Sequence, residues 1–475
     1  MRFFRLVVVC CAMAAIVGCS STVTSNTNET VNTKSPKNII MVIADGMGPA
    51  YVTAYRNYKD NPNTDRVETV VFDRMLVGTA STYPAKESGF ITDSAASATA
   101  LASGVKSYNG AIGVDVNKQP VKTVLQQAKL NGMKTGVAVT SQVVHATPAS
   151  YAVANESRRN YNDIAESFFE DRINGDFVLD VILGGGQSYF EREDRNITGE
   201  FIDAGYQYVD TYNKLATITQ QQRVLGLFAP VGLPWALDDS RDNRLAYLTE
   251  HAIKNLENPN GFFLLVEASQ VDWAGHANDI NSAMAEMHDL ALTMELLETY
   301  VSQNPDTLVV LTADHSTGGL TIAANGEYRW SPEWSRTATA SVSSTIKSMV
   351  ETDDRIALVE RDLGFSLNDD ERELVHSIDT QANQRAQEAV LKHIVDARTN
   401  TGWTTSGHTG VDVDVFAFGR GFEMFRGAMD NTDIADKLFL LLGDQPASDA
   451  SNTKAPSSDP QEETDVCSFK DSWRC

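Results

Sequence analysis

Short apolar runs recur along the chain and are separated by stretches with helical periodicity. The runs are continuous in Val, Ile and Leu and do not alternate with polar residues, which predicts strands buried on both faces of a sheet. Such strands are expected at 38–45, 134–140, 177–184, 262–267, 307–314 and 413–419. Helices are expected at 121–131, 163–172, 242–257, 280–302 and 431–442. The pattern predicts an α/β fold, with a mostly parallel central sheet flanked by helices on both faces.

The strand rhythm is interrupted between residues 325 and 401, where aromatic turns precede charged helical segments. We interpret this segment as an insertion or cap on a catalytic domain formed by residues 38–324 and 402–445. It either covers a pocket, contributes to a dimer surface or is inert. No motif in it favours one of the three.

The first nineteen residues have the features of a bacterial lipoprotein signal peptide. A basic start is followed by an apolar core that is too short to be a good membrane span. Ile16-Val-Gly-Cys19 then resembles a lipoprotein cleavage box, although an ordinary signal peptide that contains cysteines is the alternative. We expect export to the bacterial cell envelope (periplasm or outer membrane) and a lipid anchor on Cys19.

Polar segments follow the signal peptide and end the chain. Residues 20–37 are expected to be a flexible tether, and residues 446–475 a polar C-terminal tail. In that tail, Cys467 and Cys475 either close a small disulfide loop or stay free.

The formal net charge of −24 argues against nucleic acid or an anionic membrane surface as a partner. An anionic substrate would need cations placed locally at its site.

Residues 89–104 combine a short extended segment, Gly89–Thr92, with a run of small residues that predicts a helix. Asp93 is a good N-cap residue, and Gly104 is a plausible stop. Ser94 would lie in the first turn, beside unpaired backbone N–H groups and the positive end of the helix dipole, where a phosphate is favoured. A tightly packed helix with no chemical role is the alternative.

Acidic residues stand at the carboxyl ends of three predicted strands, at Asp45, Glu267 and Asp314. Ligands bind at this edge of an open α/β sheet. Four of the eight histidines lie in loops near such ends or beside a carboxylate, namely His145, His276, His315 and His408. Mixed His and carboxylate sets suit zinc, whereas hydroxyl and carboxylate oxygens suit magnesium. Each cluster alone could be structural, but together they predict metal binding.

These motifs resemble those of alkaline phosphatases and occur in the same order over residues 38–442. The shared motifs are Asp45-Gly-Met-Gly, Thr92-Asp-Ser-Ala-Ala-Ser-Ala-Thr, His145-Ala-Thr-Pro, Glu267 through His276, Thr312-Ala-Asp-His and Gly407-His-Thr-Gly. The resemblance implies a homodimeric α/β metallophosphatase with two zinc ions and one magnesium ion, acting on small phosphate monoesters.

The resemblance also implies roles, residue by residue. Ser94 looks like the nucleophile that becomes phosphorylated, and Arg158 like the arginine that clamps the phosphate, with adjacent Arg159 as the alternative. The implied metal ligands are Asp272, His276 and His408 for one zinc, Asp45, Asp314 and His315 for the second, and Asp45, Thr147 and Glu267 for magnesium. Asp93, His145 and Trp273 would lie beside the ligands.

Two positions depart from the best-known enterobacterial type. His145 stands where that type has Asp, and Trp273 where it has Lys, which puts the preferred metal of the magnesium site in doubt.

Two other functions compete with a phosphomonoesterase. One is a phosphodiesterase or sulfatase of the same superfamily, and the other is a non-catalytic lipoprotein that binds phosphate or metal.

Overall fold

The structure is a computed structural model that describes residues 35–444. The predicted signal peptide, Cys19, most of the tether and the tail with Cys467 and Cys475 lie outside the described residues. Within residues 35–444, no helix has both the length and the apolar character needed to cross a membrane.

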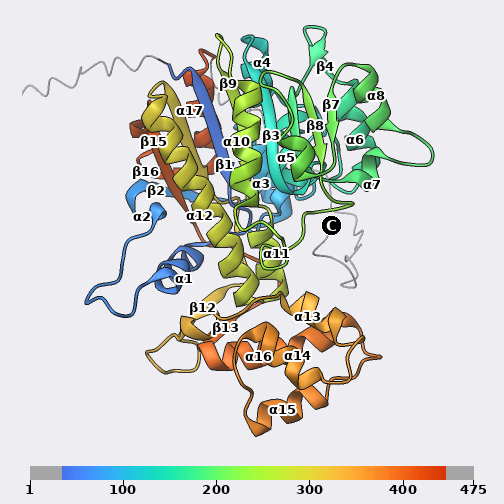
Figure 1. The fold of residues 1–475 in the computed structure, drawn as a ribbon. Helices are drawn as coiled ribbons and strands as arrows, with labels where there is room; N and C mark the ends of the chain where they lie inside the picture. Colours follow the sequence, from blue (N-terminus) through green and yellow to red (C-terminus); the bar gives the residue numbers. More distant parts are fainter. Residues whose placement is uncertain (1–34, 445–475) are drawn as a thin grey trace, which may run out of the picture. The chain divides into compact units, whose positions relative to one another are not determined.

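A ten-stranded sheet forms the centre of the fold (Figure 1). Its order is β16-β2-β15-β10-β1-β9-β3-β6-β8-β7, and all neighbours are parallel except β15, which is antiparallel to both β10 and β2. The mostly parallel sheet is confirmed. The strands are β1 (Asn38–Ile43), β2 (Leu76–Ser81), β3 (Lys134–Gln142), β6 (Val181–Gly185), β7 (Gln207–Val209), β8 (Val224–Leu227), β9 (Phe262–Glu267), β10 (Thr307–Thr312), β15 (Val413–Gly419) and β16 (Gly427–Asp430).

Helices cover both faces of this sheet, as expected (Figure 1). Helices α10 and α12 pack on one face, and α3, α4, α5 and α17 pack together on the other. The helices are α1 (Pro49–Lys59), α2 (Val71–Met75), α3 (Ser94–Ser103), α4 (Val124–Leu130), α5 (Ala146–Ala152), α6 (Tyr161–Glu170), α7 (Gln187–Phe190), α8 (Ile197–Asp203), α9 (Tyr212–Leu215), α10 (Arg244–Leu256), α11 (Gln270–Ala277), α12 (Ile280–Gln303), α13 (Val342–Ser348), α14 (Arg355–Leu363), α15 (Asp369–His376), α16 (Gln384–Thr399) and α17 (Asn431–Leu441).

Three small two-stranded sheets complete the fold. They are β4 (Arg172–Ile173) with β5 (Asp176–Phe177), β11 (Ser316–Thr317) with β14 (His408–Thr409), and β12 (Leu320–Ile322) with β13 (Thr401–Trp403).

Two expectations about strands need correction. The predicted strand 177–184 begins only at Val181, because Phe177 belongs to the β4–β5 hairpin. The segment Gly89–Thr92 forms no strand, since it lies in a bend and loop before α3.

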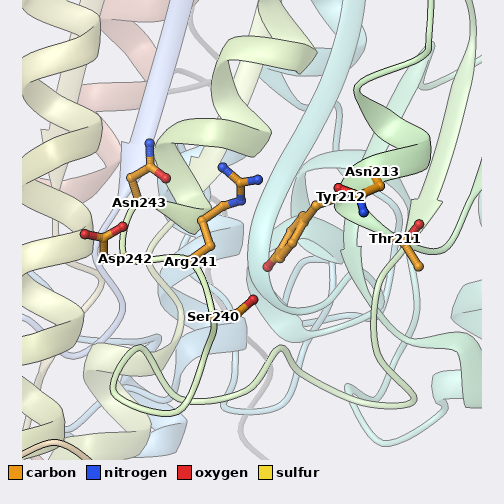
Figure 2. Close-up of a pocket in the computed structure, with 7 residues that line it drawn as sticks. All are labelled: Thr211, Tyr212, Asn213, Ser240, Arg241, Asp242 and Asn243. Carbon is orange, nitrogen blue, oxygen red and sulfur yellow. The ribbon is translucent and has the colours of Figure 1, made fainter.

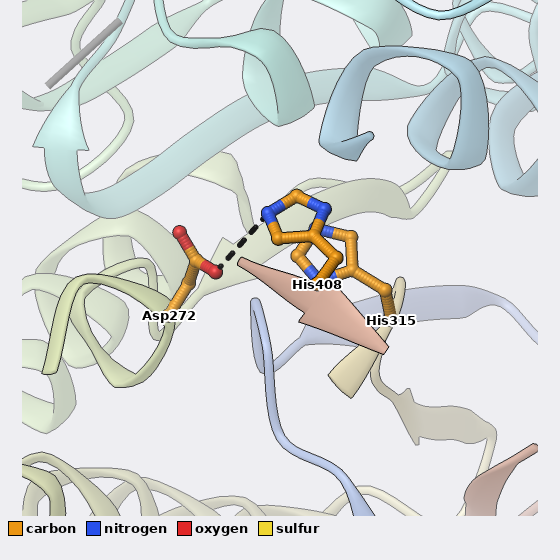
Figure 3. A group of neighbouring side chains, drawn as sticks. All are labelled: Asp272, His315 and His408. Atoms are coloured by element: carbon orange, nitrogen blue, oxygen red, sulfur yellow. Dashed lines mark ion pairs between the residues drawn. The ribbon is translucent and has the colours of Figure 1, made fainter. Parts of the chain in front are cut away.

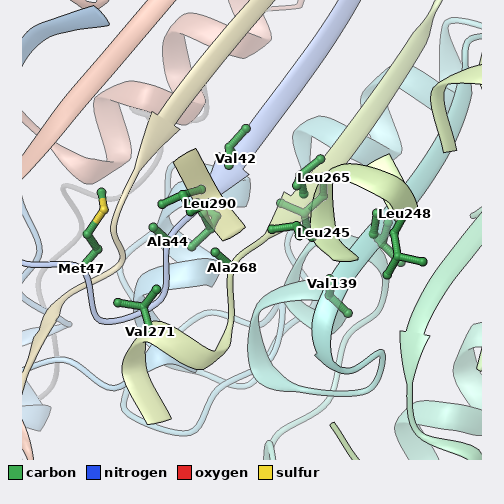
Figure 4. Packing of buried hydrophobic residues seen from close by; sticks show 14 of the residues in the cluster. Val42, Ala44, Met47, Val139, Leu245, Leu248, Leu265, Ala268, Val271 and Leu290 are labelled. Atoms are coloured by element: carbon green, nitrogen blue, oxygen red, sulfur yellow. The ribbon is translucent and has the colours of Figure 1, made fainter. Parts of the chain in front are cut away.

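The central strands are buried along their whole length, which explains why their sequences are continuously apolar. Figure 4 shows Leu245 and Leu248 of α10 and Leu290 of α12 among sheet residues such as Val42 and Leu265. Burying a side chain of this size contributes roughly 1.5–3 kcal/mol. This packing fixes the level at which each strand ends.

The register of β1 with its neighbours brings the acidic strand ends together. Ile43 pairs with Glu267 of β9 and with Thr312 of β10. Asp45 and Asp314 each lie two residues after the paired residues Ile43 and Thr312, so they follow adjacent parallel strands at the same height in the sheet. The sheet thus gathers three carboxylates at one edge.

The predicted insertion, residues 325–401, contains α13–α16, which Figure 1 shows gathered beyond the end of α11. Polar contacts fasten it to the rest of the chain. Arg336 donates to the carbonyl of Asn57 at 2.7 Å, Ser341 to Asp238 at 2.7 Å, and Lys392 to the carbonyl of Ala277 at 2.6 Å.

Candidate active site

Ser94 begins helix α3 at the carboxyl edge of the sheet. Asp93 is the N-cap, and its side chain accepts from the Ala96 N–H at 2.9 Å, while Gly104 ends the helix in the left-handed conformation. Both features confirm the prediction for this segment. The Ser94 Oγ lies 3.1 Å from Nε2 of His315, which follows β10. The hydroxyl is thus buried beside an imidazole and at the N-terminus of a helix, where the helix dipole favours an anion.

Asp45, Asp314 and His315 form one group of candidate metal ligands, and all three are buried. Nε2 of His315 is 3.4 Å from Asp45 Oδ1 and 3.2 Å from Asp314 Oδ2. Gly46 lets the chain turn directly after Asp45. Its φ of +77° suits glycine, and a Cβ there would lie 2.6 Å from the Cα of Asp272.

Asp272, His276 and His408 form the second group. Asp272 and His276 lie four residues apart on α11 and so share a face, with Nε2 of His276 3.4 Å from Asp272 Oδ2. Nε2 of His408 is 3.6 Å from Asp272 Oδ1 and 3.1 Å from Nε2 of His276. The Nε2 atoms of both histidines therefore converge on one carboxylate.

The pairing of β11 with β14 places this second group against the first. Thr317 pairs with His408, so the rings of His315 and His408 stack with centroids 3.6 Å apart. Figure 3 shows the two rings overlapping beside Asp272, and the atoms of these three residues are themselves close enough to hold an ion. His315 thus lies between the two groups.

Main-chain carbonyls set the direction of two of these imidazoles. Nδ1 of His276 is 2.6 Å from the carbonyl of Ser406, and Nδ1 of His408 is 2.8 Å from the carbonyl of Thr92. Each Nδ1–H donates to a carbonyl, so each Nε2 keeps its lone pair for a metal.

Asp45, His145 and Glu267 form a third group of buried side chains. Oε2 of Glu267 accepts from Ser269 at 2.7 Å and from Ser141 at 3.3 Å. Thr147, in the first turn of α5 after its N-cap His145, is also buried. The sequence predicted His145 only beside the ligands, whereas here it is a member of the group.

Burial and mutual repulsion disfavour charge on these carboxylates. Burial, reinforced by neighbouring carboxylates, raises the pKa of Asp45 and raises the pKa of Asp314 to about 8. Burial raises the pKa of Glu267 to about 7. The pKa of Asp272 is lowered, because His276 and His408 outweigh its burial. A bound cation would remove this electrostatic cost.

Burial acts in the opposite direction on the imidazoles. It lowers the pKa of His145 to about 3 and the pKa of His315 well below its ordinary value. Both rings are therefore neutral at physiological pH, which is the form that binds metal.

The residues fit metal ions by a further criterion, namely buried polar atoms left without hydrogen-bond partners. Within residues 35–444 such atoms include both oxygens of Asp45, Oδ2 of Asp314, Oε1 of Glu267, Nδ1 of His145 and Oγ1 of Thr147. Buried polar atoms normally have partners, so the five unpaired oxygens in one place indicate a cation-binding site.

Arg158 lies at the more open side of this site. Its Nη1 donates to Asp93 Oδ2 at 3.0 Å, and its Nη2 is 3.1 Å from Nε2 of His145. Four side chains on this side are 14–21% exposed, namely those of Arg158, Asp93, His276 and His408. The deeper side chains of His315, Asp45 and Asp314 are only 0–1% exposed. The neighbouring Arg159 is exposed. The open side is where a substrate can enter.

Trp273, on α11, packs edge-on against His145 at 6.1 Å and against Trp235 at 6.5 Å between ring centroids. With Trp273 included, all the predicted site residues lie at one edge of the sheet. The hollow of about 380 Å³ in Figure 2, lined by residues such as Tyr212 and Arg241, includes none of them.

Sequence reasoning missed several hydroxyls that support this site. Thr317 Oγ1 donates to Asp272 and lies 3.2 Å from Nδ1 of His315. Ser97 Oγ donates to the carbonyl of Asp314 at 2.7 Å. The only available signal was that Ser97 lies three residues after Ser94, on the same helix face.

The model for the alkaline phosphatase family matches residues 36–443 of this chain. Alkaline phosphatase 4 of Bacillus subtilis (strain 168) is 44% identical over 410 residues, which cover 86% of this chain and 88% of that protein.

Solved structures agree with this match. The crystal structure of a cold-active alkaline phosphatase from the psychrophile Shewanella sp. is 52% identical with a TM-score of 0.81, covering 85% of this chain and 99% of that one. A mutant of the alkaline phosphatase from the Antarctic bacterium TAB5, with Mg bound in its M3 site, is 27% identical with a TM-score of 0.65. That match covers 86% of this chain and 99% of the TAB5 chain.

Proposed function

This chain belongs to the alkaline phosphatase family, a family of phosphomonoesterases, and we propose that it acts through a phosphoserine formed on Ser94. The observation that carries the proposal is the position of the Ser94 hydroxyl. It lies at the N-terminus of α3, 3.1 Å from His315 and beside a group of carboxylates with unpartnered oxygens.

The proposed ligand sets follow the three groups. Asp272, His276 and His408 would hold one zinc ion, and Asp45, Asp314 and His315 the other. Asp45, Thr147 and Glu267 would hold magnesium through oxygen atoms, while His145, whose Nε2 accepts from Arg158, would lie beside them. When bound, these ions would act as Lewis acids that neutralise charge on the entering and leaving oxygens of a phosphoryl transfer.

The protein's own groups would bind and orient the phosphate. The N–H groups of the first turn of α3 attract an anion at Ser94. Arg158 presents a guanidinium fork that matches two phosphate oxygens, and its contacts with Asp93 and His145 hold it in direction. In the first step a bond forms between Ser94 Oγ and phosphorus, the ester P–O bond breaks, and the proton lost by Ser94 ends on the departing alcohol. In the second step the oxygen of water bonds to phosphorus, the bond between Ser94 Oγ and phosphorus breaks, and a proton from the water returns to Ser94 as inorganic phosphate leaves.

A phosphodiesterase of the same superfamily remains the nearest alternative. Arg158 argues against it, because a guanidinium that clamps two phosphate oxygens would meet the second ester group of a diester. A non-catalytic binding protein would need no hydroxyl at Ser94.

We further propose that the protein is exported, anchored by a lipid on Cys19 and active as a homodimer. The family match supports the dimer, and the sequence of residues 1–19 supports the anchor.

The test is the Ser94→Ala variant, assayed with an aryl phosphate monoester. We expect kcat/KM to fall by about 10³-fold or more, and the rapid burst of released phenol that marks a covalent intermediate to disappear. Ser103→Ala is the matched control, because Ser103 is equally buried on α3 but bonds only to that helix and its C-terminal turn. Turnover retained by Ser94→Ala would refute the nucleophile.

A further inference from the structure

The first turn of α3 touches the segment Asp314-His315 at two points. Ser94 Oγ lies 3.1 Å from Nε2 of His315, and Ser97 Oγ donates to the main-chain carbonyl of Asp314 at 2.7 Å. Helix positions three apart lie on one face, so a single rigid turn makes both contacts. The turn that carries the proposed nucleophile is therefore tied to the two proposed zinc ligands by the hydrogen bond from Ser97 as well as by the contact of Ser94. The Ser97 bond takes no part in the chemistry.

The direction of the Ser97 hydroxyl is set by Asn431, the first residue of α17. A serine hydroxyl has one proton to donate and can also accept. Asn431 Nδ2 donates to Ser97 Oγ at 3.1 Å, which occupies the accepting side and leaves the proton for Asp314. Asn431 and Ser97 are at most 1% exposed, so water cannot replace either partner.

Lys106 fixes which way the Asn431 amide faces. Its Nζ donates to Asn431 Oδ1 at 2.6 Å and lies 2.9 Å from Asp430 Oδ1. An ammonium group can only donate, so the amide oxygen must face Lys106 and the amide nitrogen must face Ser97. The chain of donors runs in one direction, from Lys106 through Asn431 and Ser97 to Asp314.

The side chain of Asp314 is held at the same time. Its Oδ1 accepts from the N–H of Gly46 at 3.1 Å and from the N–H of His315 at 3.0 Å. Its Oδ2 has no hydrogen-bond partner within the described chain and is 3.2 Å from Nε2 of His315. With the carbonyl fixed by Ser97, the whole Asp314 residue is immobilised except for the oxygen that would bind metal.

We infer that Asn431, acting through Ser97, is a positioning residue that sets the distance between Ser94 and the ligand pair Asp314 and His315. This inference rests on the proposed function and adds to it a part of the chain more than 330 residues from the nucleophile. If the network were merely structural, breaking it would lower stability without affecting metal retention or kcat specifically.

Asn431→Asp is the variant that separates the two roles. The substituted carboxylate has nearly the same shape but cannot donate, so Ser97 would turn its proton toward it and away from Asp314. Lys106 would keep its hydrogen bond to the new carboxylate while also pairing with Asp430, and an acidic residue in the first turn of α17 is favourable for the helix dipole. Folding should therefore be preserved.

We expect Asn431→Asp and Ser97→Ala each to lower kcat by about 10- to 100-fold and to speed zinc release to a chelator by a similar factor. KM and the thermal unfolding midpoint of Asn431→Asp should stay close to those of the parent protein. The double variant should be no worse than Ser97→Ala alone, since Asn431 acts through Ser97.

Ser103→Ala again serves as the control, because it removes a buried hydroxyl from α3 without a contact to Asp314. If Asn431→Asp and Ser97→Ala release zinc and turn over like Ser103→Ala, the positioning role is refuted while the function stands. If the parent protein itself has no chelator-sensitive monoesterase activity, the proposed function fails instead.

Discussion

Arg158 shows how much of this site depends on a single side chain. Its guanidinium contacts a carboxylate on one side and the neutral ring of His145 on the other. Despite its burial, the carboxylates nearby raise its pKa, so it is always charged. A fixed cation at the open side of an otherwise acidic site can attract and align an anionic substrate.

We therefore expect Arg158→Ala to lower kcat/KM for a phosphate monoester by about 10²-fold, the loss typical of one transition-state donor. The inhibition constant of inorganic phosphate should rise as well, because the phosphate loses two hydrogen bonds. Arg159→Ala, one residue along and exposed, should leave both quantities near the parent values. The reverse result would make Arg159 the clamp.

Residues with distinctive chemistry could be located from the sequence, but the residues that hydrogen-bond to them and hold them in place could not. Asp45, Glu267 and Asp314 were found because strand ends are recognisable and a parallel sheet collects them. Ser97, Thr317 and Asn431 carry common side chains, and only the folded chain shows that Ser97 and Thr317 contact proposed ligands and that Asn431 contacts Ser97. The position of His145 within the third group also depends on how α5 leaves β3.

At the scale of elements, a buried charge cluster holds the loop before α10 against α12. Arg244, fully buried, bonds to Glu286, to Asp289 at 3.0 Å and to the carbonyl of Pro234. Glu286 also accepts from the N–H of Ala236 at 2.9 Å. This loop carries Trp235, which packs on Trp273 beside the proposed ligand Asp272. The cluster therefore links core packing to the edge of the site.

Removing Arg244 would leave two carboxylates buried without a cation. We expect Arg244→Ala to lower the free energy of unfolding by about 3–5 kcal/mol, measured by urea denaturation. Lys254→Ala on the same helix is the control, because its pair with Glu250 is exposed and should contribute less than about 1 kcal/mol. Equal effects of the two variants would contradict the role assigned to the cluster.

Strands that are buried on both faces were predicted correctly from the sequence, whereas exposed or short strands were not. Strands β1, β3, β9 and β10 are buried on both faces and were located to within two residues at each end. Strands β2 and β16 carry small or polar residues and exposed positions, so neither their pairing with each other nor the pairing of β2 with β15 had a sequence signal. Short β7 and β8 were missed because three or four residues make no detectable period.

At the scale of the whole molecule, the protein is acidic and its candidate site also holds carboxylates, although the substrate expected there is an anion. The net charge is −24, and four of the carboxylates that contribute to it lie in the site and are at most 3% exposed. Only cations can make such a site attractive to a phosphate, and Arg158 supplies one charge. We therefore expect activity to require metal ions at every pH.

The most direct test compares hydrolysis of an aryl phosphate monoester with the matching diester between pH 7 and 10. Each is measured before chelation, after it, and with zinc and magnesium added back separately. We predict monoester turnover that chelation abolishes and zinc restores, with the diester much slower. Turnover that survives complete metal removal, or a preference for the diester, would contradict the account.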